Sequence, residues 1–401
     1  MKRIILSLLI TFSVFNAAEA KTFLVSLKSD NTSWKHLKKN SELIKYQCNE
    51  NLNEMWYLVQ PGDILWVAKG TYKSSKILLA KQAVIIYGGF AGTENKPEER
   101  ALFDRDNNGK IEPWEFQNET VIDGSQINTN IVGIGVESTD FTLDGLVFSG
   151  AKLKQNQEAM AAAGGAIYMN TKNGLVSKCV IENCSATAAR AGSQGGGIAI
   201  IEGKIDYCLI QDCKLSGITG KTLGAGVYLN GENAIMTNSV VRNNNLESFV
   251  VPQMNGGGVA INKGKAENCI IVNNSTVGNG GGVVLISNGR LINSIVANNT
   301  AATNGGGVFI FDAGTVQNCT IWNNYDSEAK LLNDIVKNGN QPSEVSNNTL
   351  GQESSIFLKE PYKNKYVAPA KKLFAVPFST IGFGNTPELK EKIKAANWDI
   401  K

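Results

Sequence analysis

One short phrase recurs six times between Gly164 and Asn324. Its copies are GGAIYM (164–169), GGGIAI (195–200), GAGVYL (224–229), GGGVAI (256–261), GGGVVL (280–285) and GGGVFI (305–310). A second phrase follows each copy: KCVIENC (178–184), YCLIQDC (207–213), NSVVRNN (238–244), NCIIVNN (268–274), NSIVANN (293–299) and NCTIWNN (318–324). Successive copies start 31, 29, 32, 24 and 25 residues apart. A unit of this size cannot bury its own apolar face, so the copies must stack into a solenoid.

Both phrases are short apolar runs between glycine and asparagine, which is typical of strands between tight turns. Glycine permits positive φ, and asparagine tolerates left-handed turns. One asparagine per unit is predicted to stack on the next and to pass amide hydrogen bonds from rung to rung: Asn244, Asn274, Asn299 and Asn324. Parallel strands about 4.8 Å apart would result. The prediction is an all-β fold, a single-stranded right-handed parallel β-helix.

The units differ in length by up to eight residues, the difference between steps of 32 and 24. We expect the excess to loop out at 185–194, 214–222 and 245–255. Length variation in solenoids collects on the functional side, so a concave or flat face lined by these segments is the expected binding region.

The ends of the chain have a different composition from the repeats. Residues 1–20 combine Lys2 and Arg3 with an apolar run, Ile4–Phe15, and a small-x-small site at Ala18 to Ala20. A run of about 12 residues is too short to cross a bilayer, so we predict a secretory signal peptide and an exported protein. No second apolar run follows, and we expect no transmembrane segment after signal removal.

The remaining chain divides into three predicted parts. Residues 21–60 form an N-terminal cap, a strand followed by a Lys-rich helical stretch. Residues 61–324 form the β-helix, which an insertion at 93–118 interrupts. Residues 325–401 form a C-terminal cap and an irregular tail with an amphipathic helix at 387–396. Exposed terminal strands invite edge pairing, which is the physical reason to expect caps.

The charge balance argues against one class of partner. The net charge is +3 with 19% charged residues, well short of the basic excess of a nucleic-acid surface, so we expect no nucleic acid partner. The single histidine, His36, lies in the predicted cap, which excludes mechanisms built on two histidines. We expect a monomer.

Seven cysteines in an exported chain raise the question of disulfides. One repeat position holds cysteine in four copies and serine in two: Cys179, Cys208, Ser239, Cys269, Ser294 and Cys319. This interchange favours small buried side chains, and hence unbridged core thiols. Cys184 and Cys213 share a second position, which is Asn in the other copies, and a bridge between these neighbouring rungs stays open.

The insertion contains a calcium-type motif, D-x-[DN]-x-[DN]-G-x5-E, at 104–115. The predicted ligands are the side chains of Asp104, Asp106 and Asn108, the carbonyl of Lys110, Glu112, and both oxygens of Glu115. Ile111 takes the apolar anchoring position, with helices expected at Pro97–Phe103 and from Pro113. A single such site predicts structural calcium and not a switch. The alternative is an acidic surface loop without a metal.

Several segments resemble known families. GGAI with a strand ending in Asn-Asn or Cys resembles the polymorphic outer membrane protein repeat. GDILWVAKGTY (62–72), IIYGGFAGTE (85–94), LDGLVFSG (143–150), FAVPFSTIGFG (374–384) and NWDI (397–400) resemble exported right-handed β-helix proteins of the pectin-lyase-like superfamily. The resemblance implies the fold, but this fold hosts lyases, hydrolases, esterases and adhesins.

Catalytic groups typical of such hydrolases, paired aspartates with a histidine, are missing from the repeats, and we assign no catalytic or cofactor-binding residue. The best charged cluster is Asp206 and Asp212 with Lys204 or Lys214, interpreted as solvated surface. Asp123 and Asp144 precede glycines and are predicted to cap turns.

We therefore expect a non-catalytic, adhesin-like surface protein that binds a glycan or a cell-surface protein. The alternative is a polysaccharide lyase or hydrolase acting on an acidic glycan. The side chains able to stack on sugars or pair with acidic groups are Arg190, Arg242, Arg290, Tyr168, Tyr207, Tyr228, Phe249 and Trp322.

Overall fold

The computed structural model describes most of the chain from Ala20 to Leu358. The described residues are 20–38, 40–74, 78–80, 83–107, 109–135, 140–155, 162–188, 192–217, 221–248, 255–327, 331–338, 341–350 and 355–358. The predicted signal peptide, apart from Ala20, and the predicted helix at 387–396 lie outside them. None of the helices in the described part is long and apolar enough to span a membrane.

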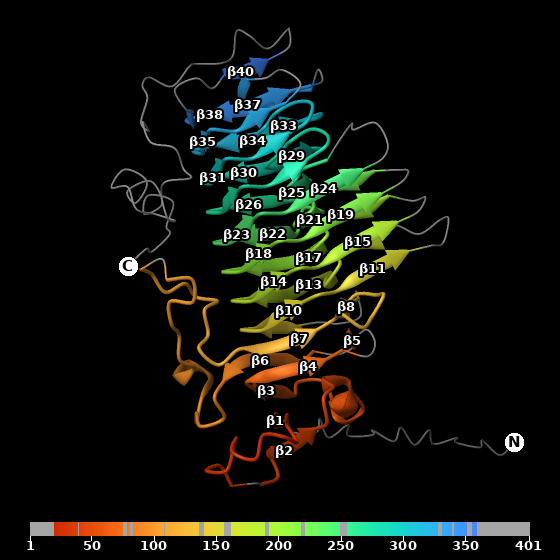
Figure 1. Ribbon diagram of the computed structural model, residues 1–401, viewed down its shortest axis with the longest axis vertical. Helices are drawn as coiled ribbons and strands as arrows, with labels where there is room; N and C mark the ends of the chain where they lie inside the picture. The colour runs from red at the N-terminus through yellow and green to blue at the C-terminus, as the bar shows by residue number, and fades with distance from the viewer. Residues whose placement is uncertain are drawn as a thin grey trace, which may run out of the picture.

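The described strands stack almost entirely in parallel into a solenoid of about seven turns with little helix (Figure 1). The predicted fold class is confirmed. Each full turn contributes one strand to each of four faces, which we number in chain order. Figure 1 shows the N-terminal rungs at one end of the long axis and β40 (Ser355–Leu358) at the other.

Faces 1 and 2 are formed by the first two strands of each turn. Face 1 contains β5 (Leu78–Ala80), β8 (Val132–Ile134), the first halves of β13 (Ile167–Ser177) and β17 (Ile198–Asp206), β21 (Val227–Asn230), β25 (Val259–Asn262), β29 (Val283–Ile286), β33 (Val308–Ile310) and β37 (Leu331–Lys337). Face 2 contains β2 (Leu43–Cys48), β1 (Thr22–Leu27), β3 (Ile64–Ala68), β6 (Ile85–Phe90), β9 (Thr142–Asp144), the second halves of β13 and β17, β22 (Ala234–Thr237), β26 (Lys265–Glu267), β30 (Gly289–Ile292), β34 (Gly314–Gln317) and β38 (Glu344–Ser346).

Faces 3 and 4 complete the turn. Face 3 contains β4 (Gly70–Lys73), β7 (Thr120–Asp123), β10 (Val147–Ser149), β14 (Val180–Glu182), β18 (Leu209–Gln211), β23 (Val240–Arg242), β27 (Ile270–Val272), β31 (Ile295–Ala297), β35 (Thr320–Trp322) and β39 (Thr349–Leu350). Face 4 contains β11 (Lys152–Gln155), β15 (Ser185–Ala188), β19 (Lys214–Gly217), β24 (Asn245–Ser248), β28 (Ser275–Thr276), β32 (Thr300–Ala301) and β36 (Tyr325–Asp326).

The bends between faces explain the repeated Asn and Gly. A single left-handed residue turns face 2 into face 3, as at Asn268 with φ 55°, and another turns face 3 into face 4, as at Asn273 with φ 57°. Asparagine adopts this conformation more readily than other non-glycine residues. At the Gly-rich bend the rungs pass very close: a Cβ on Gly281 would lie 2.3 Å from the Gly306 carbonyl. A side chain at Gly281 would therefore clash with the next rung, although the equivalent position holds the small residue Ala225 in one copy.

The predicted asparagine ladder is confirmed. The Asn244 amide donates to Asn274 Oδ1 (2.9 Å), Asn274 to Asn299 (3.0 Å), and Asn299 to Asn324 (2.9 Å). All four side chains are fully or almost fully buried. The Oδ1 atoms of Asn274, Asn299 and Asn324 also accept the backbone N–H of the preceding asparagine, and Asn244 Oδ1 accepts that of Cys213. Every rung therefore satisfies the buried polar groups of its neighbour.

The cysteine and serine ladder is also present inside the solenoid. The backbone N–H of Cys208 donates to Ser239 Oγ (3.0 Å), and that of Cys269 to Ser294 Oγ (3.1 Å). All seven cysteines are buried and unbridged, so the interpretation as core thiols is confirmed and the bridge between Cys184 and Cys213 is wrong. Burial raises the pKa of the Cys269 and Cys319 thiols to about 12.

The Lys-rich helical stretch expected near the N-terminus is wrong. Residues 28–42, as far as they are described, form turns, and Leu43–Cys48 is the strand β2, paired in parallel with β1. Ile44, Tyr46 and Cys48 pack toward the core while Lys45 and Gln47 alternate with them, which is the period of a strand. The one helical segment nearby is the 3-10 helix η1 (Leu52–Leu58).

At the other end, the solenoid continues beyond the last recognisable phrase. Strands β36 to β40 follow Asn324, and the backbone N–H of Cys319 donates to Asn348 Oδ1 at 2.8 Å. Asn348 thus takes the position that cysteine or serine holds in earlier rungs. The Gly-rich phrase that marks the other rungs is missing here, which is why the sequence did not show this turn.

The three overlong segments do not simply loop out, and that expectation is wrong for their first residues. β11, β15, β19 and β24 pair in parallel without a register shift and project from the body (Figure 1). The short strands β12 (Ala162–Ala163), β16 (Ser193–Gln194) and β20 (Thr222–Leu223) return to the main body. We call β11, β15, β19 and β24 the ridge. Its core holds Leu153, Ala186, Leu215 and Leu246.

Candidate functional site

The insertion at 93–118 folds as a hairpin against the outside of the solenoid. Leu102 and Phe116 form an antiparallel bridge, and the Phe103 N–H donates to the Glu115 carbonyl at 3.0 Å. These backbone bonds exclude the two predicted flanking helices: the described residues show only the 3-10 helix η2 (Pro97–Glu99) and no helix from Pro113. Trp114 packs on the apolar outer residues of face 3.

Arg100 anchors this insertion. Its Nη2 lies 2.7 Å from Asp144 Oδ1, its Nη1 donates to the Gly88 carbonyl (2.9 Å), and its Nε donates to the Pro97 carbonyl (2.7 Å). Asp144 was expected to cap a turn and instead carries this ion pair. The guanidinium carbon also lies 4.6 Å from the Phe116 ring centroid. Asp123 does cap its turn, accepting the Ser125 N–H at 2.9 Å.

Three of the predicted calcium ligands come together. Oxygens of Asp104, Asp106 and Glu115 all lie within 4.8 Å of one another. Asp104 accepts the N–H of Gly109, which has φ +84° as the motif requires. The Glu112 N–H donates to Glu115 Oε2 at 2.9 Å. Asn108 lies outside the described residues, and Lys110 follows the turn, half-buried.

Several carboxylates lie close together in this cluster. Glu115 is 4% exposed, and burial, together with the nearby Glu112 and Asp106 carboxylates, raises its pKa to about 8. A divalent cation would offset this repulsion, and oxygen donors are what calcium prefers, so the residues present fit the ion. The predicted anchor Ile111 is wrong, because its side chain is 57% exposed.

The cluster is tied to the repeats. Asp106 Oδ2 lies 3.7 Å from Arg242 Nη1 on β23, and Arg242 Nε donates to Gln211 Oε1 at 2.9 Å. Arg105 lies 3.1 Å from Glu119 and 3.9 Å from Glu182. Arg242 therefore links β23 to the insertion.

The ridge presents two columns of polar side chains on its outer surface. By strand register the columns are Lys152, Ser185, Lys214 and Asn245, and Lys154, Thr187, Ser216 and Glu247. All three lysines are exposed. Thr187 and Ser216 share a hydrogen bond (2.8 Å), and Asn245 donates to Glu247 (2.8 Å). The result is a surface of hydroxyl, amide and ammonium groups with one carboxylate, that of Glu247.

The charged cluster proposed from sequence is not assembled. Asp206 pairs with Lys204 (3.0 Å) and accepts from Asn238 (2.9 Å) on face 2. Asp212 lies at the following bend, with φ 54°, where burial raises its pKa and Arg242 opposes that shift. Lys214 belongs to the ridge. The carboxylates thus serve separate local contacts.

The aromatic candidates are scattered. Tyr228 is buried and Tyr168 half-buried on the outer side of face 1, and Trp322 lies on face 3. Tyr207 occupies a left-handed bend, with φ 52°. Arg290 is exposed on β30. Arg190 and Phe249 lie outside the described residues.

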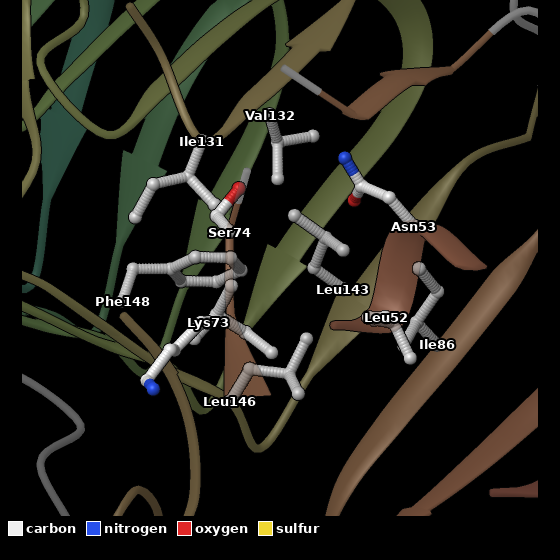
Figure 2. A pocket seen from close by; sticks show the side chains of 11 residues that line it. Leu52, Asn53, Lys73, Ser74, Ile86, Ile131, Val132, Leu143, Leu146 and Phe148 are labelled. Carbon is white, nitrogen blue, oxygen red and sulfur yellow. The ribbon is translucent and has the colours of Figure 1, made fainter. Parts of the chain in front are cut away.

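A small cavity lies inside the lower rungs and is lined mainly by apolar side chains (Figure 2). Ile86, Leu143 and Phe148 belong to the main core, and the amide of Asn53 and the hydroxyl of Ser74 are polar groups on its wall. The cavity is a packing defect of the core, and its lining offers few polar groups to a ligand.

The comparisons with known proteins address the fold. The family model for the right handed beta helix region matches residues 111–301 and also residues 165–350. The chain belongs to this family. A solved structure of a rhamnogalacturonan lyase is similar over 93% of this chain and 98% of its own, with a TM-score of 0.39 and 13% identity. No curated protein matches the chain.

Proposed function

We propose that this member of the right-handed β-helix family is an exported, non-catalytic binding protein that recognises an acidic glycan on its ridge. Export rests on the signal-like residues 1–20. An adhesin-like role agrees with the resemblance of its repeats to those of polymorphic outer membrane proteins.

This proposal rests on the stacking of the ridge strands. The register of the ridge strands places Lys152, Lys154 and Lys214 on one exposed face, among hydroxyl and amide groups and the carboxylate of Glu247. Ammonium groups pair with sugar carboxylates, and hydroxyls and amides exchange hydrogen bonds with sugar hydroxyls. Neighbouring rungs repeat every ~4.8 Å, a spacing comparable to one sugar ring. An extended glycan lying along the solenoid axis would meet the same groups repeatedly.

A charge reversal tests the ridge. We expect the purified chain to retain acidic glycans on an array, and the variant Lys152→Glu, Lys154→Glu, Lys214→Glu to bind about tenfold more weakly or worse, because each exposed ionic contact contributes roughly 0.2–1 kcal/mol. The matched control reverses three exposed lysines elsewhere, Lys69, Lys172 and Lys263. Equal loss in both variants would show a nonspecific charge effect and contradict the proposed site.

An absorbance assay tests whether the protein cleaves acidic polysaccharides. The protein is incubated with acidic polysaccharides while ultraviolet absorbance is followed for unsaturated products. We expect no increase above the heat-denatured control. Sustained product formation would replace this proposal with a lyase.

We further propose that the 104–115 loop holds one structural calcium ion. Replacement of Asp104 and Glu115 by alanine is expected to abolish calcium binding in titration calorimetry, because it removes two of the three clustered carboxylates. Replacement of the exposed Glu42 and Glu98 removes the same charge and should leave binding unchanged. Unaltered binding in the first variant would place the ion elsewhere.

A further inference from the structure

The carboxylate of Asp63 is buried at the start of β3, where the residue is only 2% exposed. Each of its two oxygens accepts one backbone N–H: Oδ1 accepts that of Lys21 at 2.8 Å, and Oδ2 accepts that of Gln60 at 2.7 Å. Both donors are neutral peptide groups. An aspartate this deeply buried usually has a cationic partner, because a buried carboxylate is costly without a compensating charge.

The contact between Lys21 and Asp63 is fixed by the backbone. Lys21 directly precedes β1, which pairs in parallel with β2 on one side and with β3 on the other. The Ile64 N–H donates to the Lys21 carbonyl at 2.8 Å. The turn that leads into β3 is closed by the Asp63 N–H, which donates to the Gln60 carbonyl at 3.1 Å. The pairing of two neighbouring strands therefore holds the Lys21 nitrogen against the Asp63 carboxylate.

The predicted signal peptide ends at the peptide bond before Lys21. The small-x-small site at Ala18 to Ala20 places cleavage between Ala20 and Lys21. Hydrolysis of this bond with one water gives a carboxylate on Ala20 of the released peptide and an α-amine on Lys21. An α-amine is mostly protonated at neutral pH. Cleavage would therefore convert the N–H that donates to Asp63 into a cation at the same place.

We propose that the α-ammonium of Lys21 in the mature chain forms an ion pair with the buried Asp63 carboxylate, so that signal removal fixes β1 in face 2. The proposal rests on the proposed export of the chain. Hydrogen bonds between charged groups are about twice as strong as those between neutral groups. Chain termini are poorly ordered unless they are tied down. The N-terminal rungs therefore reach their full stability only after processing.

Two chains that differ by one residue test the ion pair. One begins at Lys21 and the other at Ala20, where the α-ammonium lies one residue further out, by about 3.8 Å along the chain. Asp63→Asn is made in both chains, and Glu42→Gln, which removes an exposed carboxylate next to β2, is the matched control. We expect Asp63→Asn to lower the urea midpoint about twice as much in the chain that begins at Lys21, because only that chain contains the pair. Glu42→Gln should change both chains equally.

The reactivity of the N-terminus gives a measurement that needs no substitution. Both chains are treated with an amine-reactive reagent, and mass spectrometry of the N-terminal peptide separates the α-amine from the Nζ of Lys21. We expect the α-amine of the chain that begins at Lys21 to react about tenfold more slowly than that of the chain that begins at Ala20. Equal labelling rates, or equal midpoint losses from Asp63→Asn in the two chains, would overturn the proposal.

The intact mass of the exported protein tests the processing step itself. We expect Lys21 to be its first residue, and a different first residue would also overturn the proposal. None of these measurements involves a glycan. The ion pair can therefore fail while the ridge still binds, and the glycan array can fail while the ion pair is confirmed.

Discussion

Replacing Arg100 by methionine should destabilise the N-terminal half of the solenoid by about 3–5 kcal/mol, the usual effect of removing one partner from a buried ion pair. The Arg100 and Asp144 side chains are 6% and 10% exposed. Methionine retains much of the apolar contact with the Tyr87, Phe90 and Phe116 rings but leaves the Asp144 carboxylate unpaired. Denaturant unfolding followed by tryptophan fluorescence measures the loss.

A matched substitution shows whether the loss of stability comes from the burial of the ion pair or from removing any arginine charge. Arg105→Met removes another arginine of the same insertion whose side chain is 33% exposed, and we expect a change below about 1 kcal/mol. In the double variant Arg100→Met with Asp144→Asn, part of the stability should return, because no charge is then buried alone. Equal effects of the two arginine variants would mean that the ion pair does not hold the insertion.

We expect the second large loss of stability from Asn299→Asp. The Asn299 amide donates to Asn324 Oδ1, to the Ile271 carbonyl and to the Ala297 carbonyl. A carboxylate loses all these donations and is buried, and each unsatisfied buried group costs about 1–3 kcal/mol. We therefore expect a loss of at least about 3 kcal/mol, seen as a lower urea midpoint.

The adjacent residue provides the control. Asn298 occupies the left-handed bend with φ 55°, is half-buried, and accepts one hydrogen bond from Asn323 (2.7 Å). Aspartate tolerates this backbone conformation, so Asn298→Asp should change stability by less than about 1 kcal/mol. If both variants lose the same stability, the ladder contributes no more than a surface contact.

Features that repeat in the sequence were predictable. The Asn ladder and the Cys and Ser ladder follow from residue identity at one repeat position. Residues at the same position of successive repeats lie next to each other once the rungs stack. The strands of the ridge were not predicted. Their apolar residues, such as Ala186 and Leu246, are few, and the alternation of apolar and polar residues is too short to distinguish a strand from a loop.

Contacts between distant, unrepeated residues could not be read from the sequence. Arg100 and Asp144 are 44 positions apart and belong to no motif. In the calcium-type loop, the structure brings together three of the residues named by the motif, Asp104, Asp106 and Glu115. It did not reveal that the flanking chain forms a hairpin, because Leu102 and Phe116 pair through their backbones, which no motif encodes.

The Asn ladder also makes the length of this molecule adjustable. Asn274, Asn299 and Asn324 are 25 residues apart and bond in the same way, so the rung that ends at Asn299 could be removed and the remaining two would meet with matching donors and acceptors. Each such deletion or duplication would shorten or lengthen the body by about 4.8 Å. The regular rungs thus act as a spacer, which can set how far the ridge and the insertion stand from the C-terminal end.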